Sequence, residues 1–170
     1  MKKRYVILAG AAIACAAYLG TICPRIKGKP DMTPFEGKVF VHRGMFGGDA
    51  PENSLAAFAK AVENGYGIEL DVQLSSDGEA IVFHDSSLLR MYGENKNLNT
   101  LSAAELKEYG IPTLKEALEI IDGKVPVIVE LKGEGRDVTI APISAAVLDE
   151  YAGDYCVESF NPFIIKWFKE

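Results

Sequence analysis

Cysteine and histidine are scarce in this chain, and their scarcity excludes two common ways of stabilising a small domain. The three cysteines are Cys15, Cys23 and Cys156, and only the last lies outside the apolar N-terminal stretch. Because one cysteine cannot form an internal disulfide, none is expected in the globular part. Two histidines and no Cys-Cys-His-His spacing also exclude a structural zinc site. Any bound metal ion is therefore expected to have oxygen ligands.

Basic residues do not outnumber acidic ones, which argues against nucleic acid as a partner. Eighteen Lys and Arg stand against 24 Asp and Glu, giving a formal net charge of -6. Such a chain offers no basic face to a phosphate backbone. With 48% hydrophobic and 25% charged residues, the composition is that of a globular domain with a real core.

The chain has one long hydrophobic run, at its N-terminus. Residues 5–23 carry no charge, and Lys2, Lys3 and Arg4 precede them. A helix of this length can cross the ~30 Å hydrocarbon core of a membrane. We therefore expect residues 1–24 to form a single transmembrane helix in the cell membrane, with the domain outside the cytoplasm. The alternative is a secreted protein, because residues 14–16 resemble a signal-peptide cleavage site.

The rest of the chain predicts a short linker and an α/β domain. Residues 25–37 are rich in proline and glycine and predict a linker, and the domain is expected over residues 38–170. Apolar runs predict strands over residues 39–42, 66–74, 79–85, 125–132 and 156–160. Helices are predicted from Leu55 to Val62, after the capping boxes that begin at Ser102 and Thr113, over residues 137–151, and after Asn161-Pro162. Strands and helices that alternate in this way fit either a doubly wound sheet or a β/α barrel.

Charged and titratable residues interrupt the predicted strands near their carboxyl ends. They are His42 with the adjoining Arg43, Glu69, Asp71, His84, Glu130 and Lys132. Burying an unpaired charge costs several kcal/mol, on the order given by transfer measurements, so these groups need partners. In β/α folds the carboxyl ends of strands gather at one edge, where ligands bind. We therefore expect these residues to lie together.

The second and third strands are expected to form an antiparallel hairpin. Only residues 75–78 join them, too few for a parallel crossover, and Asp77-Gly78 is a typical turn pair. If Asp77 and Gly78 alone form the loop, His84 pairs with Asp71. If all four residues form it, His84 pairs with Glu69. Either register would place His84 opposite a carboxylate.

This set of residues suits the hydrolysis of an anionic phosphodiester. Glu69, Asp71 and Glu130 are hard oxygen ligands of the kind that bind Ca²⁺ or Mg²⁺. A cation with neighbouring Arg and Lys residues can neutralise phosphoryl oxygens. Two histidines can divide the roles of general base and general acid. Each motif alone has a structural reading, such as a helix cap for the sequence Pro-Glu-Asn-Ser at residues 51–54.

Several motifs, taken in order and spacing, resemble the glycerophosphodiester phosphodiesterase family. They are HRG (42–44), PENS (51–54), ELDVQLSSDG (69–78), VFHD (82–85), IPTLKEAL (111–118), VELK (129–132) and SF (159–160). The resemblance implies an irregular TIM barrel that uses a divalent cation, Ca²⁺ or Mg²⁺, to hydrolyse glycerophosphodiesters to an alcohol and sn-glycerol 3-phosphate. In such enzymes the glycerol hydroxyl beside the phosphate attacks first, and water then opens the cyclic phosphate.

The resemblance also assigns roles to the residues at the strand ends. It makes His42 and His84 the general acid/base pair, Glu69, Asp71 and Glu130 the metal ligands, and Arg43 and Lys132 the phosphate contacts. A complete barrel takes about 250 residues, so the barrel is expected to end after about five strands.

Two other functions fit the same residues. One is a catalytically inert, membrane-anchored fragment that binds a phosphate headgroup or a partner protein. The other is a different metal-dependent phospholipase on a similar barrel. The sequence does not indicate the alcohol released or the oligomeric state.

Overall fold

The computed structural model describes residues 10, 12, 13, 15, 16 and 30–169, and the chain divides into the units Met1–Thr33 and Pro34–Glu170. In the first unit, the five described residues up to Ala16 are helical. No helix among the described residues combines the length and apolar character that a membrane span requires. The anchor predicted over residues 1–24 lies mostly outside the described residues and stays a prediction.

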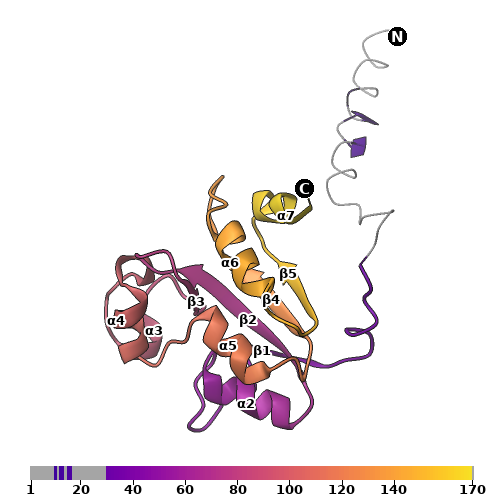
Figure 1. Cartoon of the computed structure of the whole chain (residues 1–170). Coiled ribbons are helices and arrows are strands. Elements are labelled where there is room, and N and C mark those ends of the chain that lie inside the picture. Colours follow the sequence, from indigo (N-terminus) through magenta and orange to yellow (C-terminus); the bar gives the residue numbers. More distant parts are fainter. Residues whose placement is uncertain (1–9, 11, 14, 17–29, 170) are drawn as a thin grey trace. The chain divides into compact units, whose positions relative to one another are not determined.

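Within residues 30–169, five strands form one sheet. They are β1 (Phe40–His42), β2 (Gly67–Leu74), β3 (Ala80–Val82), β4 (Val127–Leu131) and β5 (Tyr155–Glu158). The order β1-β2-β4-β5 is parallel throughout, and β3 pairs antiparallel with β2 (Figure 1). The predicted strands are thus confirmed to within a few residues, except that β3 ends at Val82 and does not reach residue 85.

The five predicted helices are present, with starts within a few residues of the prediction, and two short helices are additional. They are α2 (Leu55–Glu63), α3 (Leu89–Tyr92), the 3₁₀ helix η1 (Leu98–Thr100), α4 (Ala103–Glu108), α5 (Leu114–Ile121), α6 (Ile140–Leu148) and α7 (Pro162–Lys169). Both predicted capping boxes are present, at the starts of α4 and α5. Asn161 accepts a hydrogen bond from the Phe163 N–H at the start of α7. Residues 86–100, where the sequence predicts neither a helix nor a strand, contain α3 and η1.

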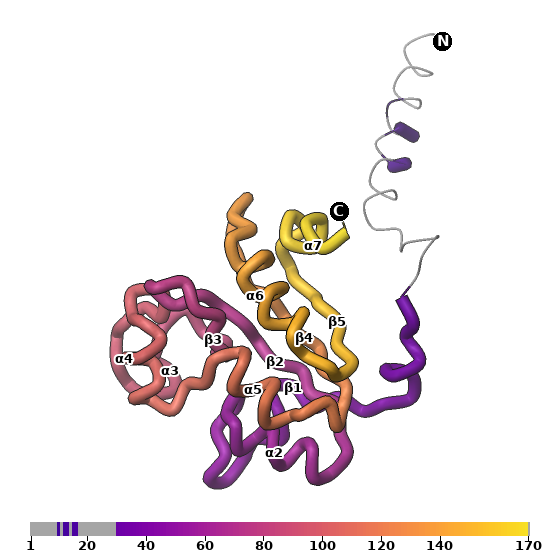
Figure 2. Tube along the Cα trace, viewed as in Figure 1, coloured from indigo at the N-terminus to yellow at the C-terminus, as the bar shows by residue number. Residues whose placement is uncertain are grey.

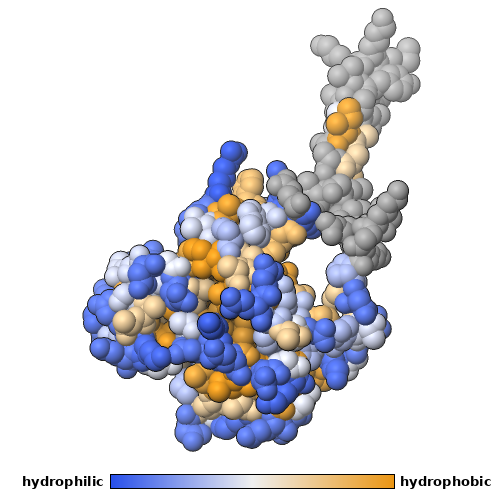
Figure 3. All heavy atoms as spheres, in the orientation of Figure 1, coloured by the Kyte–Doolittle hydropathy of each residue, from blue (hydrophilic) through white to orange (hydrophobic). Residues whose placement is uncertain are grey.

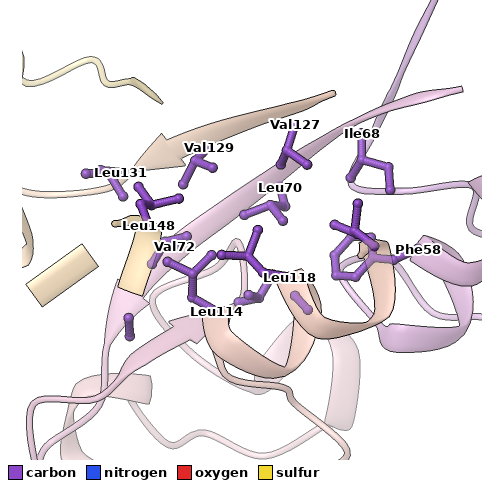
Figure 4. Packing of buried hydrophobic residues seen from close by; sticks show 14 of the residues in the cluster. Phe58, Ile68, Leu70, Val72, Leu114, Leu118, Val127, Val129, Leu131 and Leu148 are labelled. Atoms are coloured by element: carbon purple, nitrogen blue, oxygen red, sulfur yellow. The ribbon is translucent and has the colours of Figure 1, made fainter. Parts of the chain in front are cut away.

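The two faces of the sheet differ in chemistry because strand side chains alternate. On one face, Ile68, Leu70 and Val72 of β2 and alternate residues of β4 pack against α2, α5 and α6 (Figure 4). Ile164 of α7 belongs to the same cluster. The intervening residues of β2 are Glu69, Asp71 and Gln73, which therefore point to the other face. A doubly wound sheet has helices on both faces, whereas here the described helices of this core pack on one. The arrangement is that of a barrel wall.

Residues 83–112 form a lobe beside β3 with a small apolar core of its own. Ile81, Phe83, Leu88, Leu98, Leu106 and Ile111 are its buried residues. Figure 2 shows the trace leaving the sheet after β3 and returning to it at α5. The surface of the lobe is mainly hydrophilic in Figure 3, while apolar residues show along the middle of the same view. The lobe therefore has a core separate from that of the sheet, and the chain rejoins the sheet at α5.

The hairpin between β2 and β3 has neither of the two expected registers. Val72 pairs with Val82 and Leu74 with Ala80, so Phe83, and not His84, lies opposite Asp71. The loop has three residues, Ser76 to Gly78, because Gly78 adopts a left-handed conformation (φ 83°) that closes the turn. The prediction that His84 is the cross-strand partner of a carboxylate is therefore wrong.

Candidate active site

The polar face of the sheet gathers all seven of the predicted site residues near the carboxyl ends of the strands. His42 ends β1, Glu69 and Asp71 lie on β2, and Glu130 lies on β4 with Lys132 just after it. The parallel registers pair His42 with Glu69 and Asp71 with Glu130. The expectation that strand ends bring these groups together is confirmed.

The turn after β1 places Arg43 among three acids. Arg43 adopts a left-handed conformation (φ 59°), unusual for a residue with a side chain. Its backbone N–H donates to Glu69 Oε2 (2.9 Å), and its guanidinium lies 3.3 Å from Asp71 Oδ2 and 2.9 Å from Glu52 Oε1. Both the main chain and the side chain of Arg43 thus bind carboxylates.

Asp71 is completely buried and has positively charged or donating partners at both oxygens. Lys132 Nζ lies 2.8 Å from Oδ1, and Asn53 Nδ2 donates to Oδ2 at 2.8 Å. Asn53 also accepts a hydrogen bond from the Asp71 N–H (3.3 Å). Burial alone would raise the pKa of Asp71, but the hydrogen bonds from Lys132 and Asn53 and the charges of Lys132 and His84 outweigh it and lower the pKa.

Glu69 has the opposite electrostatic balance. The residue is only 7% exposed, and its Oε1 atom is buried with no hydrogen-bond partner in the described part of the chain. Burial, followed by repulsion from Asp71, Glu130 and Glu158, raises the pKa of Glu69 to about 7, although the Arg43 N–H opposes this. Asp71 has the side chains of Lys132 and Arg43 beside it, whereas the ion-pair partner of Glu69 among the described residues is His42.

Glu158, which the sequence analysis did not single out, lies in the same carboxylate group. Its strand β5 pairs it with Glu130, and one oxygen each from Glu69, Glu130 and Glu158 lies within 4.8 Å of the others. Partial burial and the charges of Glu130 and Asp71 raise the pKa of Glu158. Of the predicted metal ligands, Glu69 and Glu130 belong to this group. Asp71 pairs with Glu130 in the sheet, and Lys132 Nζ binds both Asp71 Oδ1 (2.8 Å) and Glu130 Oε1 (2.9 Å).

His84 follows β3 in a turn that one side chain fixes. The Gln73 amide Nε2 lies within hydrogen-bonding distance of three successive carbonyl oxygens, those of Phe83, His84 and Asp85 (2.8, 3.0 and 2.9 Å). His84 Nδ1 lies 2.6 Å from Asp85 Oδ1. A carboxylate at Nδ1 favours a proton there and leaves Nε2 as the free basic nitrogen. The contact with Asp85 therefore favours the His84 tautomer that carries its proton on Nδ1.

A chain of ion pairs links the two sides of the site. Asp85 Oδ2 binds Arg90 Nε at 2.6 Å, and Arg90 also binds Glu52, the partner of Arg43. Hydrogen bonds, above all from Arg90 to Glu52, lower the pKa of that acid despite its partial burial. Each carboxylate in this chain therefore stays ionised at neutral pH and fixes its neighbours.

His42 is the most exposed of the seven residues, with 65% of its side chain accessible. Its Nε2 atom lies 3.8 Å from Glu69 Oε2, a distance that makes an ion pair when the imidazole is protonated. His42 thus lies on the β1 side of the carboxylates, whereas His84 follows β3.

A cavity of about 660 Å³ adjoins the carboxylates on the side of His84. His84, Glu130 and Lys132 line it together with polar side chains that include Asn97 and Asn99. This volume is in the range of small-molecule sites. A ligand in the cavity would therefore contact one histidine and one lysine of the candidate site.

The sequence and structure comparisons identify the family of this chain. The model of the glycerophosphoryl diester phosphodiesterase family matches residues 42–158. The chain belongs to this family. It is 37% identical over 109 residues to the glycerophosphodiester phosphodiesterase of Bacillus altitudinis. The matched region covers 56% of this chain and 44% of that protein.

Solved structures of phosphodiesterases share the fold. One is an Oleispira antarctica phosphodiesterase in complex with the product sn-glycerol-3-phosphate, at 34% identity and a TM-score of 0.71, covering 79% of this chain and 62% of that one. Another is the glycerophosphodiester phosphodiesterase of Thermotoga maritima, at 31% identity and a TM-score of 0.68, covering 78% of this chain and 58% of that one. This chain therefore spans less than two thirds of the length of these relatives.

The residues present fit the divalent cation that membership of the glycerophosphoryl diester phosphodiesterase family implies. The buried Glu69 Oε1 has no hydrogen-bond partner among the described residues, and three carboxylates converge on one small region. Hard oxygen donors of this kind suit Ca²⁺ or Mg²⁺. The assignment of Asp71 as a ligand stays a prediction, as do the roles of the other six residues.

Six residues that contact the site residues or their partners in the structure were not predicted as site residues from the sequence. They are Glu52, Asn53, Gln73, Asp85, Arg90 and Glu158. The motifs Pro-Glu-Asn-Ser and Val-Phe-His-Asp contain Glu52, Asn53 and Asp85, but a helix cap explained the first equally well. In the structure Ser54 is the cap and Asn53 turns inward to Asp71. Nothing in local sequence distinguishes Gln73 or Arg90.

Proposed function

We propose that this chain hydrolyses glycerophosphodiesters to an alcohol and sn-glycerol 3-phosphate in a reaction that requires a divalent cation and histidine acid/base catalysis. The observation that carries the proposal is the convergence of His42 and His84 with the carboxylates, Arg43 and Lys132 at one edge of the sheet. The name of the Bacillus altitudinis relative and the product bound to the Oleispira antarctica relative support the same reaction.

Arg43 and Lys132 are proposed to contact the phosphate. Both lie partly buried beside Asp71, with side chains 16% and 23% exposed, so their charges are less screened than those of surface residues. Burial would lower the pKa of Lys132, but Asp71 and Glu130 raise it, so the amine stays protonated. A bound Ca²⁺ or Mg²⁺ would add charge neutralisation at the phosphoryl oxygens.

The two histidines are proposed to move the protons. One imidazole accepts the proton of the attacking hydroxyl as a P–O bond forms, and the other donates a proton to the alkoxide that leaves as the second P–O bond breaks. Asp85 holds the His84 tautomer, which gives His84 a free Nε2. The cavity beside His84 has room for part of the substrate, and the order of the two histidine roles stays open.

The test is release of sn-glycerol 3-phosphate from glycerophosphocholine and glycerophosphoglycerol by the purified 170-residue chain. Phosphorus NMR separates the diester from the monoester. We expect turnover that EDTA abolishes and that added Ca²⁺ or Mg²⁺ restores. Intact phospholipid is the matched control substrate, and preference for it would favour a phospholipase. Substrate binding with no turnover under any cation would instead support an inert headgroup-binding fragment.

We also propose that residues 5–23 anchor the chain in the cell membrane with the domain outside the cytoplasm. The charge-free stretch after Lys2, Lys3 and Arg4 is the basis of this proposal. Resistance of the chain to alkaline extraction from membranes, with protease access to the domain from the extracytoplasmic side, is the expected result. Recovery of a chain lacking its first residues in the medium would favour secretion.

A further inference from the structure

Arg90 binds the two carboxylates that hold residues on opposite sides of the candidate site. Its Nε donates to Asp85 Oδ2 at 2.6 Å, and its Nη1 and Nη2 bind the two oxygens of Glu52. The other oxygen of Asp85 lies 2.6 Å from His84 Nδ1. Glu52 Oε1 also accepts from Arg43 Nη1 at 2.9 Å. One side chain therefore joins the histidine after β3 to the arginine after β1.

The position requires the shape of an arginine side chain as well as its charge. A guanidinium group has five N–H donors in one plane, so it can bind one carboxylate at two points and a second carboxylate at Nε. The ammonium group of a lysine is a single nitrogen on a flexible stem. Arg90 lies on α3 of the lobe, and Glu52 lies 38 residues earlier in the chain. The fork of Arg90 thus spans two distant segments.

On one side, Arg90 determines how Asp85 faces His84. With Asp85 Oδ2 bound to Arg90, Oδ1 is directed at His84 Nδ1. The Asp85 side chain is partly exposed, so without Arg90 its carboxylate could rotate toward water. His84 Nδ1 would then lose its fixed acceptor, and the imidazole would lose the contact that selects its tautomer.

On the other side, Arg90 shares the charge of Glu52 with Arg43. Glu52 has one negative charge and binds two guanidinium groups. If Arg90 were absent, Glu52 would pair with Arg43 alone and would compete more strongly for it with an anionic ligand. Arg90 therefore keeps the Arg43 guanidinium available.

The exposure of Arg90 separates a positioning role from a stabilising one. Its side chain is 48% exposed, whereas those of Glu52 and Asp85 are 13% and 22% exposed. Ion pairs of an exposed residue contribute little to stability, because water screens them and the side chain loses entropy. The variants of Arg90 are therefore expected to fold, and the effect of Arg90 is expected in the geometry of the site.

We propose that Arg90 is a positioning residue for both sides of the site: through Asp85 it fixes the His84 imidazole, and through Glu52 it keeps Arg43 available to the phosphate. This inference deepens the function proposed above and rests on it for the roles of His84 and Arg43. Arg90 itself contacts neither residue directly in the listed bonds of its guanidinium, which go to Glu52 and Asp85.

The first test observes His84 without any turnover. The chain has two histidines, so nitrogen-15 NMR of the full chain in non-ionic detergent resolves two imidazoles, and His42→Ala assigns them. At about pH 9, where an ordinary imidazole is neutral, we expect the proton of wild-type His84 on Nδ1. In Arg90→Ala the two nitrogen shifts of His84 should move toward each other as both tautomers become populated. Lys115→Ala removes one charge from an exposed ion pair with Glu150 and is the matched control.

The second test measures the two expected effects of Arg90 separately. Arg90→Ala should lower kcat for glycerophosphocholine at least about tenfold, because His84 is misplaced. It should raise the Kd for sn-glycerol 3-phosphate, measured by calorimetry, about two- to fivefold, the size of one exposed ion pair. Arg90→Lys can bind only one of the two acids and should recover at most one effect. Recovery of both by lysine would overturn the bridging role.

A double-mutant cycle shows whether Arg90 acts on kcat through Asp85. If it does, Arg90→Ala combined with Asp85→Asn should lower kcat about as much as Asp85→Asn alone. Losses that multiply would show that Arg90 acts by another route, and the inference would fail.

The outcomes distinguish this inference from the proposed function. If the wild type releases sn-glycerol 3-phosphate and Arg90→Ala keeps the wild-type His84 spectrum or the wild-type kcat, only the inference fails. If the wild type never hydrolyses the diester while Arg90→Ala changes the His84 tautomer, the proposed function fails and the positioning of His84 by Arg90 stands.

Discussion

Gln73 is the side chain that fixes the turn containing His84. Its amide reaches three carbonyl oxygens in a row, and no other described side chain bonds to all three. A leucine in its place would keep the volume and leave these acceptors without that donor. In the proposed reaction a histidine nitrogen must lie within about 3 Å of the atom whose proton it takes, so a small displacement of His84 would lower the rate.

We therefore expect Gln73→Leu to lower kcat at least about tenfold with little change in KM, since misplacement of a base affects the chemical step. Steady-state hydrolysis of glycerophosphocholine measures both constants. Calorimetric Ca²⁺ binding is the internal control and should be unchanged, because the hydrogen bonds of the Gln73 amide go to backbone carbonyls and not to the carboxylates. An unaltered kcat would show that Gln73 does not position His84.

Glu69 predicts a pH dependence of stability for the cation-free protein. Its pKa is raised from 4.5 to about 7 in the fold, chiefly by burial. Between these values the folded state binds more protons than the unfolded state, so the free energy of unfolding falls as pH rises. The contribution of Glu69 to the free energy of unfolding is fully present below about pH 4.5 and is lost above about pH 7. It amounts to about 3 kcal/mol.

Urea unfolding in EDTA at pH 5 and pH 8 tests this expectation. Glu69→Gln should flatten the decrease that the wild type shows, while the exposed Glu119→Gln on α5 should not. Asp71, whose pKa is lowered, loses its stabilising contribution only as pH falls below this range. Equal pH slopes for the wild type and Glu69→Gln would contradict the account of Glu69.

Among the elements, the contact between the end of β1 and α2 depends on Gly44. Gly44 has a φ of 78°, and a Cβ there would lie 2.9 Å from Phe58 Cδ1 and 3.0 Å from Ala57 Cβ. Phe58 is fully buried and cannot move aside. Gly93 has a similar φ of 72° but open space around it, so it isolates the backbone cost.

Gly93→Ala is expected to destabilise the protein by about 1–2 kcal/mol. Gly44→Ala adds overpacking and should cost about 1–3 kcal/mol more. Chemical denaturation of both variants measures the difference. If the two substitutions cost the same, the close approach of β1 and α2 does not constrain Gly44.

The elements show which local features could be predicted. Capping boxes and 3.6-residue periodicity are local signals, and they placed α4 and α5 correctly. The hairpin register depends on whether Gly78 adopts positive φ, a choice the dipeptide Asp-Gly does not settle. In the observed register Phe83 lies opposite Asp71, and β3 ends at Val82, so His84 lies beyond the strand and contacts Asp85.

At the scale of the whole molecule, the position of the site follows from parallel topology. Strand ends meet at one edge, so His42, Glu69 and Glu130 could be grouped from sequence alone. The role of each acid could not be predicted from sequence, because it depends on neighbouring residues from distant segments of the chain. Asn53 and Lys132 bind Asp71, while Glu158 joins Glu69 from β5.

Ion pairs between distant segments also explain why several acids can be buried. Asp71, Glu52 and Asp85 each pair with Arg43, Lys132 or Arg90, so their charges are compensated within the described residues. Glu69 differs because, among the described residues, its ion pair is with His42 and not with an arginine or lysine side chain. A cation bound there would stabilise the folded state in proportion to RT ln(1 + [L]/Kd).

The most direct test of the central claim compares the turnover of His42→Ala and His84→Ala with that of the wild type at saturating Ca²⁺ and glycerophosphocholine. Loss of a general acid or base should lower kcat about 10²–10⁴-fold in each variant. Calorimetric Ca²⁺ binding should persist in both, which shows that the carboxylate group is intact. Wild-type kcat in either variant would contradict the assignment of that histidine, and wild-type kcat in both would end the case for histidine acid/base catalysis at this site.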